Sequence, residues 1–282
     1  MKRKQAFLLT FSVILIGALY FLGDFKGKKK HNGHTHNEAM NASPQNPIEN
    51  IDALDFKQFE LSQENSLNEQ KKATLSELKV KAIKKETAHE YKDIAEFWEK
   101  ENELIIAAFY YKKAAFLENT EKSITFAGSL YLALLEREGD MSKLKWLSLE
   151  AIPCFEKVIE LNPNNDNAKV ALATCYTEGM GETMKGVTIL REITAKDSTN
   201  IPANLMLGKM SIQSGQFDKA INRLELVLSK TPENTEAMYF LAEAYKGQGN
   251  KAKAISLFEK CKSIVNNPEF SKEIDNYIKT FN

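Results

Sequence analysis

Four small residues recur at nearly constant spacing along the C-terminal half of the chain. Ala151, Gly186, Ala220 and Ala254 are separated by 35, 34 and 34 positions. Such a period is typical of a helix-turn-helix unit that stacks on copies of itself. Two helices cross closely only where one facing side chain is no larger than alanine, which explains the small repeated residue. The chain is therefore expected to form an array of helical hairpins.

Large and small residues alternate in the same order around this period in five segments. The five segments carry Tyr91, Ile94, Ala95, Trp98, Ala107, Tyr111 and Ala114, then Ile124, Ala127, Gly128, Tyr131, Ala151, Phe155, Val158 and Pro163, then Lys169, Leu172, Ala173, Tyr176, Gly186, Leu190 and Ile193, then Asn204, Leu207, Gly208, Ser211, Ala220, Leu224, Val227 and Pro232, and then Met238, Leu241, Ala242, Tyr245, Ala254, Phe258 and Cys261. The pattern resembles the tetratricopeptide repeat (TPR), a helical hairpin of about 34 residues. This resemblance implies an all-α solenoid of about five repeats that ends in a capping helix.

The resemblance divides the folded part of the chain into a lead-in, an array and a cap. The lead-in, at residues 51–87, is expected to be a helix or a loose coil. The TPR array occupies residues 88–268, and the capping helix occupies residues 269–282. The five repeats are expected near residues 88–120, 121–165, 166–200, 201–234 and 235–268.

Two repeats depart from the pattern. The gap from Ala107 to Ala151 is 44 residues, which is ten more than one repeat, so we expect extended helices and a protruding loop near Gly139, Asp140 and Met141. The fourth repeat has Asn204 and Ser211 where the pattern has bulky residues, which is expected to weaken it.

Glycines follow the first helix of three repeats. Gly179, Gly181, Gly215 and Gly249 fall in the turns between the paired helices. A left-handed residue ends a helix at low cost when it is glycine. We therefore expect all four glycines to serve this purpose.

An uncharged segment lies near the N-terminus. Residues 6–23 contain no charged side chain, and their helical length of about 27 Å approaches the thickness of a bilayer core. We predict a retained single-pass anchor, with a cleaved signal peptide as the alternative. Basic residues flank both ends, but the short tail at residues 1–5 carries three of them and is expected to stay in the cytoplasm. The repeats would then lie on the periplasmic side of an inner membrane.

The linker at residues 24–50 is rich in Gly, Asn, Pro and charge. It has too few apolar residues to bury a core, so we expect it to be disordered. His31, His34 and His36 lie close together in it and could in principle bind a transition metal. The favoured interpretation is a solvated tether without a metal.

Composition argues against nucleic-acid binding and against catalysis. The 38 basic and 38 acidic residues cancel, so no basic field attracts phosphates. The three cysteines, Cys154, Cys175 and Cys261, are expected to be packing residues. The chain lacks the nucleophile, zinc and phosphate-loop motifs of common enzymes. We expect no enzymatic activity and no cofactor.

The TPR resemblance also implies where a partner would bind. TPR proteins typically use the inner faces of their first helices as a groove for a peptide or helix. The matching offsets here select Val170, Leu205, Lys209, Ile212, Tyr239 and Glu243, with His89, Lys92, Glu96, Thr174 and Lys246 as further members. For the apolar residues of this set, packing on adjoining helices is the alternative. The Lys and Asn clamp of chaperone-binding TPR domains is absent, because Glu96, Ser129 and Thr174 occupy its positions.

These expectations favour a membrane-tethered scaffold that binds a protein or peptide partner. It would resemble the anchored TPR proteins of bacterial envelope assembly and maturation. The alternatives are a structural organiser that self-associates as a homo-oligomer and an adaptor that faces the cytoplasm. A Tyr239→Ala change should weaken partner capture in the first case and leave a self-associating organiser intact.

Overall fold

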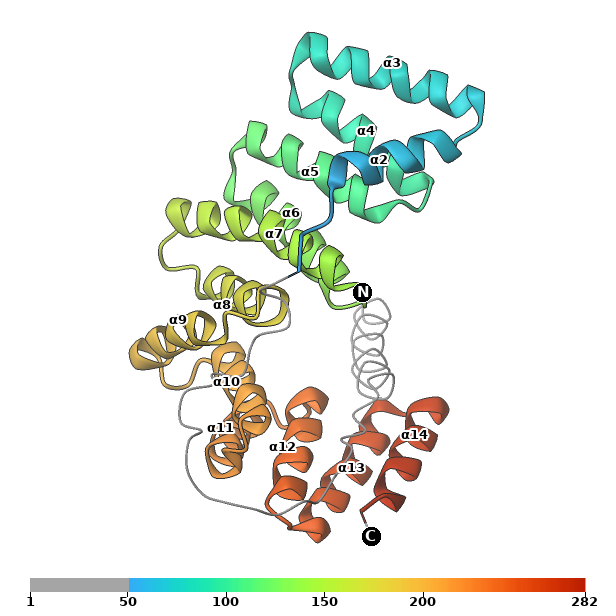
Figure 1. The fold of residues 1–282 in the computed structure, drawn as a ribbon. Helices are drawn as coiled ribbons and strands as arrows, with labels where there is room; N and C mark the ends of the chain where they lie inside the picture. The colour runs from blue at the N-terminus through green and yellow to red at the C-terminus, as the bar shows by residue number, and fades with distance from the viewer. Residues whose placement is uncertain (1–50, 282) are drawn as a thin grey trace, which may run out of the picture. The chain divides into compact units, whose positions relative to one another are not determined.

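All regular structure in residues 51–281, the part that this computed structural model describes, is helical (Figure 1). The expected all-α class is therefore confirmed for these residues. The chain divides into two compact units, which we treat separately. The N-terminal unit is Pro44–Leu190, and the C-terminal unit contains Arg191–Asn282.

Two pairs of neighbouring helices in the N-terminal unit, at residues 88–118 and 121–161, pack as antiparallel hairpins (Figure 1). Its helices are α2 (Phe56–Ser66), α3 (Glu69–Lys85), α4 (Ala88–Lys100), α5 (Leu104–Glu118), α6 (Glu121–Leu135), α7 (Met141–Leu161) and α8 (Asp166–Thr174), followed by the π-helix η1 (Cys175–Gly179). Helix α9 (Thr183–Lys196) crosses the boundary between the units. The pattern residues Trp98, Tyr131 and Phe155 are fully buried in the core.

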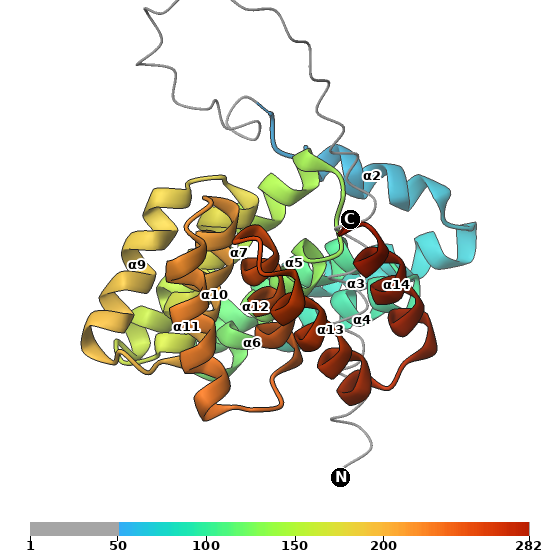
Figure 2. The same cartoon turned by 90° about the horizontal axis from the view of Figure 1, so that it is seen from below.

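The C-terminal unit contains two further hairpins and a last helix. Its helices are α10 (Ile201–Gln213), α11 (Phe217–Lys230), α12 (Thr235–Gly247), α13 (Lys251–Val265) and α14 (Pro268–Lys279). Helix α10 lies beside α11, and α14 lies beside α13, in both views (Figures 1 and 2). Phe270 and Ile274 of α14 are buried in the core together with Tyr277 and with Phe281, which follows the helix. Ile278, at the same helical spacing, is half-buried against this cluster.

Small residues lie where paired helices cross. A Cβ atom on Gly128 of α6 would lie 2.8 Å from the Phe155 ring of α7, and one on Gly208 of α10 would lie 2.9 Å from Leu224 of α11. Both distances are shorter than a normal carbon contact, so no larger residue fits without movement. The repeated pattern of small residues therefore reflects helix approach, as the sequence indicates.

The extra residues of the second repeat lengthen one helix. Helix α7 has 21 residues, whereas α6 has 15, the same as α5, so the expectation of two extended helices is only half right. Met141, expected in the loop, begins α7, because the Asp140 side chain caps the helix by accepting hydrogen bonds from the Ser142 and Lys143 amides.

The extended start of α7 holds the incoming lead-in chain. The Leu54 amide donates to the Ser142 carbonyl at 3.1 Å, and the Lys145 ammonium donates to the Ile51 carbonyl at 2.7 Å. The Phe56 ring stacks on Trp146, with a centroid distance of 4.8 Å. The lead-in itself forms two helices, α2 and α3, after the non-helical residues 51–55.

One of the four turn glycines has a different role from the one expected. Gly181, Gly215 and Gly249 have positive φ, as a left-handed turn requires. Gly179 does not, and lies in η1 against α7. A Cβ atom there would lie 1.5 Å from the Ser148 hydroxyl oxygen. Gly179 is thus required by close packing and not by backbone conformation.

Replacement of Gly179 by alanine should lower the free energy of unfolding by about 1–3 kcal/mol, because Ser148 and its buried surroundings must move. Gly139→Ala is the matched control, since nothing lies within 4 Å of the added methyl group. Its effect should stay within about 0.5 kcal/mol. Urea unfolding of the full chain followed by circular dichroism measures both; equal effects would refute the packing role.

Asn204 of the fourth repeat is buried and fully hydrogen-bonded. Its amide nitrogen donates to the Ser198 and Asn200 carbonyls, each at 2.9 Å, and its oxygen accepts from Arg223 of α11 at 2.9 Å. The side-chain amide of Asn204 therefore joins both helices of the hairpin.

Asn204→Ala should destabilise the chain by about 1–3 kcal/mol, because buried partners lose their hydrogen bonds. Asn222→Ala on the exposed side of α11 is the control and should change the free energy of unfolding little. Chemical denaturation of the two variants and of the unmodified chain measures these differences in the free energy of unfolding. A neutral Asn204→Ala would show that the buried amide contributes nothing.

The predicted anchor at residues 6–23 and the linker at residues 24–50, with its three histidines, lie outside the described residues. Within residues 51–281, no helix has both the length and the apolar character needed to cross a membrane.

Candidate protein-binding groove

The six groove residues expected from the TPR resemblance lie in both units. Val170 is half-buried on α8 of the N-terminal unit. The other five lie in the C-terminal unit, with Leu205, Lys209 and Ile212 on α10 and the remaining two, Tyr239 and Glu243, on α12. Their role in binding stays a prediction.

The apolar members in the C-terminal unit take part in its core. Tyr239 is only 5% exposed, and its ring meets the edge of Phe258 at a centroid distance of 5.3 Å. Leu205 and Ile212 are half-buried against the same cluster. This is the packing alternative that the sequence left open. A Tyr239→Ala change would therefore disturb the fold, and it is a poor test of binding.

Glu243 is a buried carboxylate with one engaged oxygen. It is 6% exposed, and its Oε2 accepts a hydrogen bond from the Tyr277 hydroxyl of α14 at 3.0 Å. Lys246 contacts the same hydroxyl and lies 4.0 Å from the centre of the Tyr277 ring. Oε1 has no hydrogen-bond partner among the described residues. Burial raises the pKa of Glu243, opposed by the hydrogen bond from Tyr277 and the charge of Lys246.

Glu243→Gln should raise the thermal unfolding midpoint at about pH 7.5, and the gain should shrink toward about pH 4.5. Because the pKa of Glu243 is raised in the folded state, its protonated form stabilises the fold at pH values below the ordinary pKa of a glutamate. This stabilisation is lost as the pH rises through the pKa of the folded state. Glutamine removes the buried charge and still accepts from Tyr277. Melting curves at the two pH values measure the change; an equal loss at both would contradict this account.

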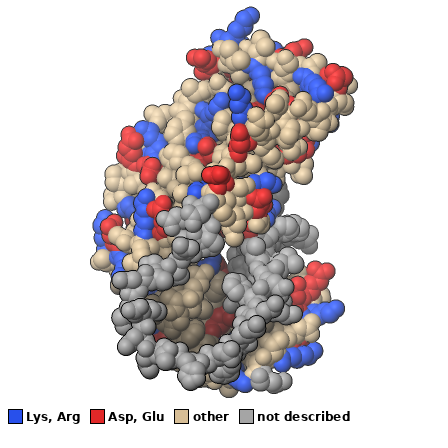
Figure 3. Space-filling model, viewed as in Figure 1, with Lys and Arg blue, Asp and Glu red and all other residues tan. Residues whose placement is uncertain are grey.

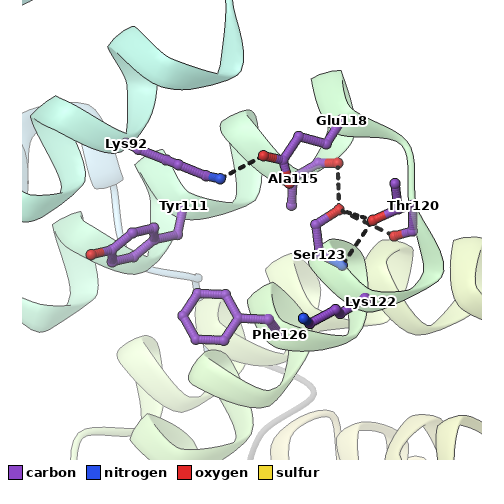
Figure 4. Close-up of a pocket in the computed structure, with 8 residues that line it drawn as sticks. All are labelled: Lys92, Tyr111, Ala115, Glu118, Thr120, Lys122, Ser123 and Phe126. Carbon is purple, nitrogen blue, oxygen red and sulfur yellow. Dashed lines mark hydrogen bonds and ion pairs between the residues drawn. The ribbon is translucent and has the colours of Figure 1, made fainter.

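An open groove runs along α5 in the N-terminal unit and consists of two adjoining hollows. The first, of about 350 Å³, lies between α4, α5 and the start of α6 (Figure 4). Its lining residues are Lys92, Tyr111, Ala115, Glu118, Thr120, Lys122, Ser123 and Phe126. The second, of about 130 Å³, is lined by Glu99, Leu104, Ala107, Ala108, Tyr111, Leu130, Ala133, Leu134 and Arg137. We call the two together the α5 groove.

Two aromatic rings form the centre of the α5 groove. Tyr111 lines both hollows, and its hydroxyl donates to Glu99 at 2.7 Å. Its ring meets Phe126 edge to face, with a centroid distance of 5.6 Å. Phe126 is 52% exposed, which is high for a large apolar residue on a repeat helix. An open aromatic surface of this kind is typical of a binding site.

The α6 wall of the α5 groove follows one helix face. Lys122, Phe126, Leu130 and Leu134 are each four residues apart and all line the hollows. The distance along the helix from the first to the last is about 18 Å, at about 1.5 Å per residue. A partner segment of about three helical turns would cover this length.

Sequence reasoning found only part of the α5 groove. The repeat offsets selected Lys92, which lines the first hollow, and also His89 and Glu96, which line neither hollow. They missed Phe126 and did not assign Tyr111 to a groove. A signal was present for Phe126, because it is a large apolar residue at a position that the repeat core does not use.

Two segments of the chain match models of a known helical repeat. Residues 211–270 match one tetratricopeptide repeat model, and residues 148–165 match another. The chain therefore contains tetratricopeptide repeats. The mouse interferon-induced protein with tetratricopeptide repeats 3 is 28% identical over 137 residues, which is 47% of this chain and 34% of that protein. The chain thus matches about a third of the length of this relative.

Two solved structures share the fold at low identity. A tetratricopeptide repeat protein from Parabacteroides merdae is 15% identical, with a TM-score of 0.53 over 80% of this chain and 84% of the other. A thermophilic TPR protein from Thermus thermophilus is 14% identical, with a TM-score of 0.50 over 69% and 98%. At these identities the likeness shows the fold alone.

Proposed function

We propose that the chain is a membrane-tethered TPR scaffold that binds a segment of another protein in its α5 groove. The observation that carries the proposal is the open aromatic centre, where Tyr111 and half-exposed Phe126 meet between two hollows. Partner segments dock on TPR and other helical surfaces by placing apolar side chains into such hollows.

The surface charge is consistent with a protein partner. Acidic and basic side chains alternate over the described face in Figure 3, and no large patch of one sign is seen there. Nucleic acids bind mainly through concentrated positive charge. The proposal requires neither a cofactor nor a catalytic step.

The proposed tether is the uncharged segment at residues 6–23. The three basic residues of the preceding tail support an N-terminus in the cytoplasm, with the repeats in the periplasm. A scaffold in this position would serve envelope protein assembly or maturation. A cytoplasm-facing adaptor is the alternative for the opposite orientation.

One observation supports self-association as a second candidate function. Val80 and Ile83 lie one turn apart on α3, and Ile83 is 74% exposed. Exposed apolar residues on a helix that precedes the repeat array suit contact with a second copy. A homo-oligomer of this kind would not need the α5 groove.

The test is crosslinked affinity capture of the full-length protein from native membranes, with protease accessibility measured on the same material. Phe126→Ala is the test variant, and Phe116→Ala is the matched control, since Phe116 is an exposed ring on α5 outside both hollows. The proposal predicts a captured protein that only Phe126→Ala loses. Equal capture by both variants would refute groove binding, and recovery of the chain alone would favour self-association.

A further inference from the structure

We propose that the segment bound in the α5 groove carries an acidic side chain one helical turn from an apolar one. The apolar side chain would pack on Phe126 and Tyr111, and the carboxylate would pair with Lys122. This inference rests on the proposed function and adds the chemistry of the partner.

Lys122 supplies the one uncompensated charge among the residues that line the first hollow. Lys92 is paired with Glu118, as the dashed line in Figure 4 shows. The Lys122 side chain is exposed and makes no ion pair or hydrogen bond with any described residue. In the second hollow, the Glu99 carboxylate already accepts a hydrogen bond from the Tyr111 hydroxyl. The end of the groove at Lys122 is therefore positive.

The neighbouring hydroxyl groups are occupied by the cap of α6. The Thr120 hydroxyl oxygen accepts a hydrogen bond from the Ser123 amide at 3.1 Å. The Ser123 hydroxyl lies within hydrogen-bond distance of the Thr120 carbonyl, at 3.2 Å, and of the Ala115 carbonyl, at 3.4 Å. They are not available to select a ligand. Lys122 lies in the first turn of α6, and its ammonium group carries the positive charge at this end of the first hollow. Charge at this position therefore favours a carboxylate over an amine.

The spacing of Lys122 and Phe126 specifies the pattern in the partner. They are four residues apart on α6 and lie next to each other at the mouth of the hollow (Figure 4). Their separation along the axis is about 6 Å, which equals a separation of four residues on a partner helix. The expected occupant is thus an amphipathic helix with Asp or Glu four residues from Leu or Phe.

The inference commits to a side-chain carboxylate and not to a chain terminus. The lining residues extend over about three turns of α6, a length that a continuous helical segment can follow without ending there. Probe peptides with an amidated C-terminus separate the two sources, because they carry no terminal carboxylate.

The test uses two amidated helical peptides of about 14 residues that share a Leu stripe and differ in one residue, Glu or Lys, four positions from a Leu. Fluorescence anisotropy with the full-length protein in detergent measures their affinities. The wild type should bind the Glu peptide about fivefold more tightly than the Lys peptide, and Lys122→Glu should reverse the preference. Lys81→Glu on α3 makes the same change in net charge outside the groove and should leave the preference unchanged.

Failure of this inference is distinguishable from failure of the proposed function. Equal affinities of the two peptides, both weakened by Phe126→Ala, would overturn the acidic preference and leave groove binding intact. Absence of binding by either peptide up to about 1 mM would overturn the inference. The capture experiment would then still decide the proposed function on its own.

Discussion

Phe258→Ala should lower the free energy of unfolding by about 3–5 kcal/mol, which makes it one of the most damaging single changes in the chain. Phe258 has no exposed surface in the core of the C-terminal unit. Its ring contacts Tyr239 of α12, and also Tyr277 and Phe281 at the end of the chain, with centroid distances of 5.3, 5.7 and 5.9 Å. Alanine would leave a cavity that the three surrounding aromatic rings cannot fill without moving.

Guanidinium unfolding of the full chain, followed by circular dichroism, measures this loss. Lys260→Ala is the control, because Lys260 is exposed on the same helix and forms no ion pair among the described residues. Its effect should be within about 0.5 kcal/mol. A loss below about 1 kcal/mol for Phe258→Ala would mean that the aromatic cluster is not packed as described.

Tyr111→Ala should reduce affinity for the captured partner by about 30-fold or more, equivalent to about 2 kcal/mol. Tyr111 lines both hollows of the α5 groove and supports the exposed ring of Phe126. Its loss would remove the wall that the two hollows share. We therefore expect a larger loss of affinity from Tyr111→Ala than from the substitution of any other single groove residue.

Tyr111→Phe is the matched control for this change. It keeps the ring and removes only the hydrogen bond from the hydroxyl to Glu99. Its affinity should stay within about threefold of the wild type. Binding titrations with the purified partner measure both variants, and thermal melts show whether each is folded. Wild-type affinity in a folded Tyr111→Ala variant would exclude the α5 groove as the binding site.

The repeat core is the part of the fold that the sequence predicts well. Trp98, Tyr131, Ala151, Phe155 and Leu224 were all assigned to the pattern, and all are buried. The prediction succeeds because the pattern and the packing have one cause: paired helices must alternate large and small side chains at each crossing. That constraint is local and repeats along the chain.

Contacts between segments far apart in sequence were not predictable in this way. The stacking of Phe56 on Trp146 joins the lead-in to the extended start of α7, across a gap of 90 residues. The close approach of Gly179 to Ser148 likewise depends on how η1 meets α7. A single sequence carries no periodic signal for such contacts.

The candidate site was only partly predictable, for a related reason. Repeat offsets show which residues face the inner side of a hairpin, but not which neighbours cover them. Glu243 was expected to face a groove, yet it is buried with Tyr277 of α14 against it. Phe126 was not selected, and it stays exposed because no described helix covers its ring. Exposure depends on neighbouring elements, which the repeat pattern does not specify.

The proposed function requires that another protein occupies the α5 groove at Phe126. A direct test places a photo-crosslinking phenylalanine analogue at position 126, and separately at position 116, and irradiates intact cells. We expect a covalent adduct with a different protein from position 126 and none from position 116. An adduct from position 116 alone, or from neither position while the tagged protein still captures its partner, would contradict it.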